Sequence, residues 1–132
     1  MYLLDTNIFL ELLLEQRNAD EVEKFLTNTS PEELYCSEFS LCSVGIILFR
    51  TDKHDVLSQF IDDLFINGGV QLISLSTSNL RILAKHAREF NLDFDDAYQY
   101  QVANNYDLTL VSIDKDFDRT EAGRVAPNKI VS

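Results

Sequence analysis

The chain is 132 residues long and carries a formal net charge of −11, from 22 acidic and 11 basic side chains. This negative balance excludes a protein that coats long nucleic-acid duplexes, because phosphate contacts require Lys and Arg. Hydrophobic residues make up 45% of the chain, which holds only four glycines and two prolines. We therefore expect one domain over residues 1–132 with a real core and without long flexible linkers.

The start of the chain and its apolar runs lack targeting and membrane-spanning patterns. The opening MYLLDTN has no basic residues of a secretory signal. The longest charge-free apolar run, 39–49, is shorter than the roughly 20 residues that cross a bilayer. We expect a soluble, cytoplasmic protein without a membrane partner. Cys36 and Cys42 have no paired spacing, and both are expected to be reduced core residues.

Apolar periodicity divides the first half of the chain into strands and helices. Thr6 or Asn7 is expected to cap the first helix. The segment 39–50 is apolar nearly all round, as in a buried helix. The predicted order is strand, two helices, strand and two helices, over residues 2–4, 7–15, 18–28, 34–36, 39–50 and 54–66.

The second half repeats this alternation. A strand over 70–75 follows the Gly68-Gly69 break, and Asn91 is expected to end the next helix. Helices over 77–89 and 94–104, a buried strand over 108–112 and a weak edge strand over 129–131 complete the prediction. Strands that alternate with helices predict an α/β fold, with a central parallel sheet of four to five strands and helices on both faces.

Acidic residues follow two predicted strands and open one helix. Asp5 comes directly after the first strand, Asp114 follows the last buried strand, and Asp93, Asp95 and Asp96 begin the helix before it. Sites in open parallel sheets form beyond the carboxyl ends of the strands. Three segments therefore bring carboxylates to one edge, where they repel one another unless a cation lies between them. Hard cations such as Mg²⁺ or Mn²⁺ prefer such oxygen ligands.

Each acid also has a purely structural interpretation. Asp5 and Asp93 are suited to capping the helices that they precede. Asp95 lies roughly 100° round the helix from Asp96, so at most one of the two faces the site. Asp116 fits a solvated turn residue equally well.

Two segments of the chain resemble the PIN-domain nucleases, the fold of VapC-type toxin ribonucleases. The opening MYLLDTNIFLE looks like the family's first strand and helix. The segment NLDFDDAYQYQVANNYDLTLVSIDKDFDR looks like the second half, in which an acid followed by Ala lies on a helix before a strand and a Ser-x-Asp motif. The resemblance runs the full length, but only these two ends are specific. It implies a three-layer α/β/α fold.

The resemblance also implies roles for individual residues. Asp5, Asp96 and Asp114 match the family's catalytic, metal-binding acids, and Asp116 matches an auxiliary metal-binding acid of many members. The residues that match the polar supports of these carboxylates are Thr6, Asn7 and Ser112.

One position departs from the family pattern. The helix after the second strand usually carries Ala-Glu where this chain has Cys42 and Ser43. A serine can hydrogen-bond but supplies no anionic oxygen, so metal binding is expected to be weaker. Glu38 could substitute only by reaching in from the strand end. A variant subgroup of PIN-like proteins resembles this chain in carrying the serine, so the change need not mean inactivity.

Basic residues near the predicted site are few. Arg81, Lys85 and Arg88 share one helical face, which is expected to be solvated. The bases better placed to meet an RNA phosphate are Lys115, Arg119 and Arg124, which follow Asp114.

These features favour a Mg²⁺- or Mn²⁺-dependent endoribonuclease, and the resemblance to VapC-type toxins implies a role as the toxin of a toxin–antitoxin pair with an antitoxin protein as partner. The alternative is a non-catalytic PIN-like interaction module, because the usual Glu is missing. A phosphoacceptor receiver domain is disfavoured, since Asp5 stands alone after the first strand. A homodimer is expected, because the helices over 7–15 and 39–50 offer more apolar surface than a small domain covers.

Overall fold

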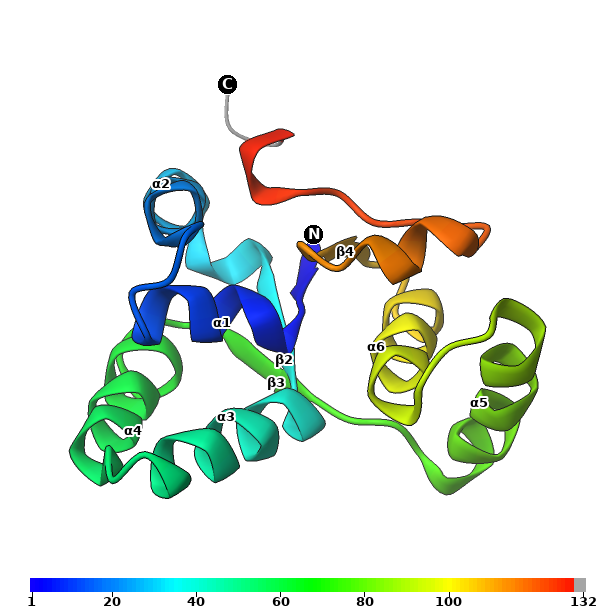
Figure 1. Cartoon of the computed structure of the whole chain (residues 1–132), viewed down its shortest axis with the longest axis horizontal. Coiled ribbons are helices and arrows are strands. Elements are labelled where there is room, and N and C mark those ends of the chain that lie inside the picture. Colours follow the sequence, from blue (N-terminus) through cyan, green and yellow to red (C-terminus); the bar gives the residue numbers. More distant parts are fainter. Residues whose placement is uncertain (130–132) are drawn as a thin grey trace.

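The computed structural model describes residues 1–129 and contains one parallel sheet in the order β3-β2-β1-β4. Figure 1 shows the short strands in the middle of the molecule. The pairing aligns Tyr2 with Leu34 on one side and with Thr109 on the other. The strands span Tyr2–Leu4 (β1), Leu34–Ser37 (β2), Gln71–Ile73 (β3) and Thr109–Val111 (β4). The predicted parallel α/β architecture is therefore confirmed.

The predicted edge strand at 129–131 is not found in the described part of the chain. Lys129 ends a short 3-10 turn that begins at Pro127, and residues 130–131 lie outside the described residues. Val125 instead forms a single parallel bridge to Val111 beside β4.

Six α-helices connect the described strands, close to the predicted positions. The predicted helix over 54–66 divides into α4 and a π-helical turn over Asp62–Ile66. Gly68 follows that turn, and a Cβ there would collide with the backbone carbonyl of Asp63. The helices span Thr6–Leu13 (α1), Ala19–Asn28 (α2), Glu38–Arg50 (α3), His54–Ile61 (α4), Thr77–Phe90 (α5) and Phe94–Asn105 (α6).

Two cap assignments can be compared with the predictions. The first helix begins at Thr6 and is capped by Asp5, so the predicted caps Thr6 and Asn7 are wrong. The carboxylate of Asp5 wins this position because its Oδ1 accepts the Thr6 amide at 2.8 Å. Asn91 ends α5 in the left-handed conformation with φ 55°, as predicted.

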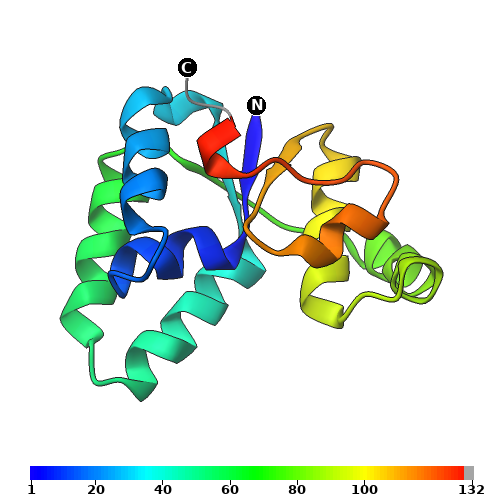
Figure 2. The ribbon, with the colours of Figure 1, turned by 45° about the horizontal axis from the view of Figure 1, so that its top comes forward.

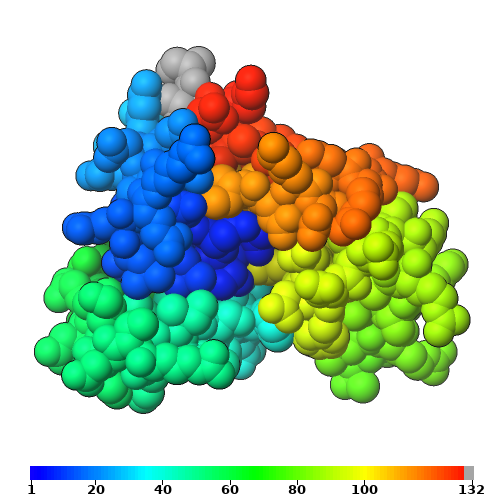
Figure 3. All heavy atoms as spheres, in the orientation of Figure 1, coloured from blue at the N-terminus to red at the C-terminus, as the bar shows by residue number. Residues whose placement is uncertain are grey.

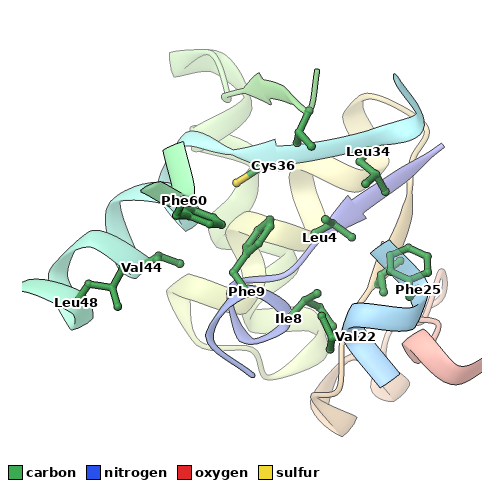
Figure 4. Packing of buried hydrophobic residues seen from close by; sticks show 12 residues of the cluster. Leu4, Ile8, Phe9, Val22, Phe25, Leu34, Cys36, Val44, Leu48 and Phe60 are labelled. Atoms are coloured by element: carbon green, nitrogen blue, oxygen red, sulfur yellow. The ribbon is translucent and has the colours of Figure 1, made fainter. Parts of the chain in front are cut away.

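The helices cover the two faces of the sheet in three layers. Helices α1 to α4 lie on one side of the sheet and α5 and α6 on the other (Figures 1 and 2). Alternate strand residues serve the two cores: Leu4 and Val111 face the first side, while Leu3 and Leu110 face the second. In Figure 4, Phe9 of α1 points between the sheet and α3, close to Phe60 of α4.

The two cysteines differ in environment. Cys36 is buried in β2, where burial raises the pKa of its thiol to about 12. Cys42 is exposed on α3, so its predicted place in the core is wrong. The apolar character of α3 exceeds what the core takes up, and Cys42 lies on the face that stays outside. None of the described helices is long and apolar enough to cross a membrane.

Truncation of Phe9 is expected to destabilise the fold strongly. Its side chain is fully buried, with its ring 5.3 Å from that of Phe60. Phe9→Ala should lower the free energy of unfolding by about 3–5 kcal/mol in a urea titration. Ile66→Ala, at a site 70% exposed, is the control and should cost less than about 1 kcal/mol. Equal losses for the two variants would contradict the assigned core.

Candidate metal centre

Parallel pairing of β1 with β4 places the ends of these two strands side by side. Leu4 pairs with Val111, and the amide of Asp5 donates to the carbonyl of Val111 at 3.0 Å. Asp5 and Ser112 therefore leave the sheet together. The start of the chain, the start of α6 and the residues after β4 meet in the middle of the face in Figure 3.

The carboxylate of Asp5 is 5% exposed and accepts four hydrogen bonds. Oδ1 accepts the Thr6 amide at 2.8 Å and the side-chain amide of Gln99 at 3.3 Å. Oδ2 accepts the Ser112 hydroxyl at 2.7 Å and the Asn7 amide at 3.0 Å. A carboxylate has about four lone-pair positions, so these donors fix its orientation completely.

The supporting residues also bind one another. Ser112 Oγ accepts the Asn7 amide at 3.2 Å and the backbone amide of Asp114 at 2.9 Å. The amide of Ile113 donates to Asn7 Oδ1 at 3.4 Å. The turn after β4 is thereby tied to the turn after β1, and Asp114 is held at a fixed distance from Asp5.

Three further carboxylates form a tight group beside Asp5. Asp96, from the first turn of α6, lies with Asp114 and Asp116 so that one oxygen of each falls within 4.8 Å of the others. Oδ1 of Asp114 accepts the amide of Asp116 at 2.9 Å, which fixes the turn between them. We call Asp5, Asp96, Asp114 and Asp116 the acidic cluster.

Burial and mutual repulsion raise the pKa of two members of the acidic cluster, Asp96 and Asp5. The pKa of Asp96 is raised to about 7, first by desolvation and then by the charges of Asp114 and Asp5. Burial raises the pKa of Asp5, although its hydrogen bonds from Ser112, Thr6 and Gln99 oppose the shift. Carboxyls with raised pKa values at one site are the environment that a divalent cation relieves.

The other acids named from the sequence lie apart from this group. Asp93 takes the N-cap position of α6, but its side chain accepts no capping hydrogen bond there. Asp95 is exposed, as expected from its angle to Asp96. Glu38 is exposed at the start of α3, and Ser43 is half-buried one turn after Ser40. Neither Glu38 nor Ser43 adds a carboxylate to the group found in the described residues.

Two of the bases after Asp114, Arg119 and Arg124, contact protein groups. Arg119 lies 3.4 Å from Oδ1 of Asp116. Arg124 pairs with Asp118 at 3.2 Å and donates to the carbonyl of Ser112 at 3.1 Å. Arg119 therefore stands at the edge of the acidic cluster, while Arg124 braces the turn that carries it.

Two polar residues of the site were missed from the sequence. Gln99, on α6, contacts Asp5, and Ser40, on α3, contacts both Gln99 and Thr6. Gln99 follows Asp96 by three positions, so the two share a helix face. That spacing was the available signal for Gln99.

Comparison with known proteins points to one family. A family model described as PIN domain matches residues 2–123. No curated protein matches the chain. A Klebsiella pneumoniae toxin–antitoxin complex superposes with a TM-score of 0.76 at 21% identity, covering 96% of this chain and 98% of that one.

Two further structures share the fold. FitAcB from Neisseria gonorrhoeae has a TM-score of 0.74 at 22% identity, over 96% of this chain and 98% of that one. VapC20 from Mycobacterium tuberculosis, a toxin that cleaves the sarcin-ricin loop, has a TM-score of 0.76 at 15% identity, over 95% and 97%. The likeness extends over almost the whole of each chain.

Removal of the Asp96 charge is expected to stabilise the metal-free protein at high pH. The folded pKa of about 7 lies above the ordinary value of 3.8, so the contribution of this carboxyl to stability is lost as the pH rises through 7. Asp96→Asn should raise the unfolding temperature in EDTA at pH 8, and the gain should shrink toward pH 5. Asp95→Asn, the exposed neighbour in the same helix turn, is the control. If the unfolding temperatures of both variants changed with pH in the same way, ionisation of Asp96 would not destabilise the metal-free protein.

Proposed function

Because this chain belongs to the PIN-domain family, whose members are typically nucleases, we propose that it is a Mg²⁺- or Mn²⁺-dependent endoribonuclease that hydrolyses RNA phosphodiester bonds. The observation that carries the proposal is the group of three carboxylates within 4.8 Å of one another. The toxin–antitoxin complex among the structural neighbours supports a role as the toxin of such a pair. An antitoxin protein is then its expected partner.

The donor set of the acidic cluster fits a hard divalent cation. Asp96, Asp114 and Asp116 would hold the ion through carboxylate oxygens, and Asp5 would add its buried negative charge from the adjacent wall. When bound, the cation supplies activation of water and neutralisation of charge on the phosphate. The carboxylate of Asp5 would be kept in one orientation by Asn7, Thr6 and Ser112. Because the cation would activate water, a protein nucleophile is not required.

Substrate contacts would come from bases at the edge of the cluster. Lys115 and Arg119 belong to the turn that follows Asp114, and their charges can meet an RNA phosphate next to the ion. Because the chain as a whole is acidic, binding of a short RNA segment is favoured over binding of a long duplex.

One observation favours a second function, a non-catalytic PIN-like interaction module. Ser43 takes the position of the family's usual Glu, and Glu38 stays exposed outside the group of carboxylates. Calorimetric titration with Mn²⁺ at pH 8 separates the two functions. Absence of binding at millimolar metal would favour the module.

A homodimer is proposed on the exposed apolar face of α3. Cys42, Gly45, Ile46, Phe49 and Leu57 line a groove of about 510 Å³ together with Arg50. Ile46 is 52% and Phe49 is 55% exposed, and a second copy of the chain would cover them. The first helix contributes less than expected, because Ile8 and Phe9 are buried in the core.

RNA cleavage is expected to require both a divalent cation and Asp5. Wild-type protein should cleave RNA oligonucleotides with Mn²⁺ or Mg²⁺ and lose activity in EDTA. Asp5→Asn should lower the rate by about 100-fold, because it removes a charge from the metal site. Asp95→Asn, which keeps the whole cluster, should cleave at the wild-type rate. Unchanged cleavage by Asp5→Asn would show that the site is assigned wrongly.

Disruption of the α3 face is expected to separate the dimer. Ile46→Glu places a charge in the apolar groove and should convert a dimer into a monomer in light scattering. Leu80→Glu, at an exposed apolar residue of α5, is the matched control and should leave the mass unchanged. A monomer mass for the wild-type chain would count against the dimer itself.

A further inference from the structure

Gln99 is a buried amide that links the acidic cluster to two other helices. Its side chain is 1% exposed and lies on α6, one turn after Asp96. Its amide nitrogen donates to Oδ1 of Asp5 at 3.3 Å and contacts the hydroxyl of Ser40 on α3. The Thr6 hydroxyl is 3.5 Å from the same nitrogen. Three elements, α1, α3 and α6, therefore meet at one NH₂ group.

The orientation of this amide is fixed by its donors alone. Oε1 of Gln99 is buried and has no hydrogen-bond partner among the described residues. A flipped amide would place Oε1 against the carboxylate of Asp5, where two acceptors repel. A buried acceptor without a partner lowers the stability of the fold. The hydrogen bond from the amide to the carboxylate of Asp5 is of the stronger, charge-assisted kind and offsets this cost.

A second buried glutamine on the same helix provides a contrast. Gln101 is 5% exposed, and within residues 1–129 its Oε1 also lacks a partner and its side chain makes no hydrogen bond to the acidic cluster. The two residues are of one type, on one helix and similarly buried. They differ in whether the amide nitrogen reaches Asp5.

The contact to Ser40 gives Gln99 a further role on the α3 side of the site. Ser43, where the family resemblance leads one to expect a Glu, follows Ser40 by one turn and adds no carboxylate. The Thr6 and Ser40 hydroxyls lie 2.9 Å apart, and Gln99 joins both to Asp5. Helix α3 is thus connected to the acidic cluster through neutral hydrogen bonds.

We propose that Gln99 is a positioning residue of the metal centre, which holds the Asp5 carboxylate in place and couples α3 to it. The inference rests on the proposed function, because it assigns to Gln99 the task of keeping the charge of Asp5 directed at the cation. Gln99 is then a neutral residue that influences metal affinity in addition to the acids, by holding the carboxylate of Asp5. Outer hydrogen-bond partners of this kind influence metal affinity by about 10–100-fold.

The test compares Mn²⁺ affinity in matched variants by calorimetry or by paramagnetic resonance of free Mn²⁺. Gln99→Met keeps the length of the side chain and removes the donor, and Gln101→Met is the control. Gln99→Asn keeps the amide but withdraws it by one methylene, so it serves if the methionine variant does not fold. Thermal unfolding of each variant in EDTA is measured first, so that Mn²⁺ affinity is compared at a temperature at which all the variants are folded.

We expect Gln99→Met and Gln99→Asn to weaken Mn²⁺ binding about 10-fold, while Gln101→Met stays within about two-fold of wild type. In an Asp5→Asn background, Gln99→Met should change the affinity by less than about two-fold, because its effect passes through Asp5. Equal affinities for the Gln99 and Gln101 variants would overturn the role of Gln99 alone. Absence of Mn²⁺ binding by the wild type would overturn the proposed metal-dependent function, and this inference with it.

Discussion

The hydrogen bonding of one buried carboxylate, that of Asp5, determines how the rest of the site is arranged. Its Oδ2 is held by Ser112 after β4 and by Asn7 in α1, and its Oδ1 by the start of α1 and by Gln99 of α6. The contact with Ser112 depends on the parallel pairing of Leu4 with Val111, which brings the ends of β1 and β4 together. An anion moved from water into this position requires such compensation. The pairing of β1 with β4 therefore helps to fix the position of the Asp5 carboxylate.

The fixed charge of Asp5 governs the protonation of its neighbours. Asp96, with its pKa near 7, is affected by Asp5 and by Asp114 together. Without a cation, Asp96 stays protonated up to about pH 7, and the stability that depends on this carboxyl is lost as the pH rises through that value. A bound cation would attract each carboxylate and so offset their mutual repulsion. Binding of a metal ion at this sheet edge is therefore expected to be coupled to the release of protons from the carboxyls.

The sequence was sufficient for the architecture and for the meeting of the acids, because both follow from strands that alternate with helices and so end at one edge of a parallel sheet. Asp5 and Asp114 come after adjacent strands, and β-strand ends are visible as apolar runs. It was insufficient for contacts that depend on tertiary packing. Gln99 lies in a helix that is buried all round, where no polar stripe distinguishes a functional amide from Gln101. The exposure of Cys42 was missed for a related reason: an apolar helix does not reveal which side meets the core.

The serine at position 43 affects both the repulsion among the carboxylates and the negative charge that is available to bind a cation. A carboxylate that reached the acidic cluster from α3 would add to the repulsion that already raises the pKa of Asp96, and its absence leaves that repulsion smaller. The same absence lowers the negative charge available to a cation. Because Ser43 is neutral, α3 contributes to cation binding only through the hydrogen bonds that hold Asp5 in place. Gln99 of α6 holds Asp5 directly, and Ser40 of α3 contacts Gln99. Neutral hydrogen bonds from these two helices therefore support the metal centre on the side where the family pattern has a further carboxylate.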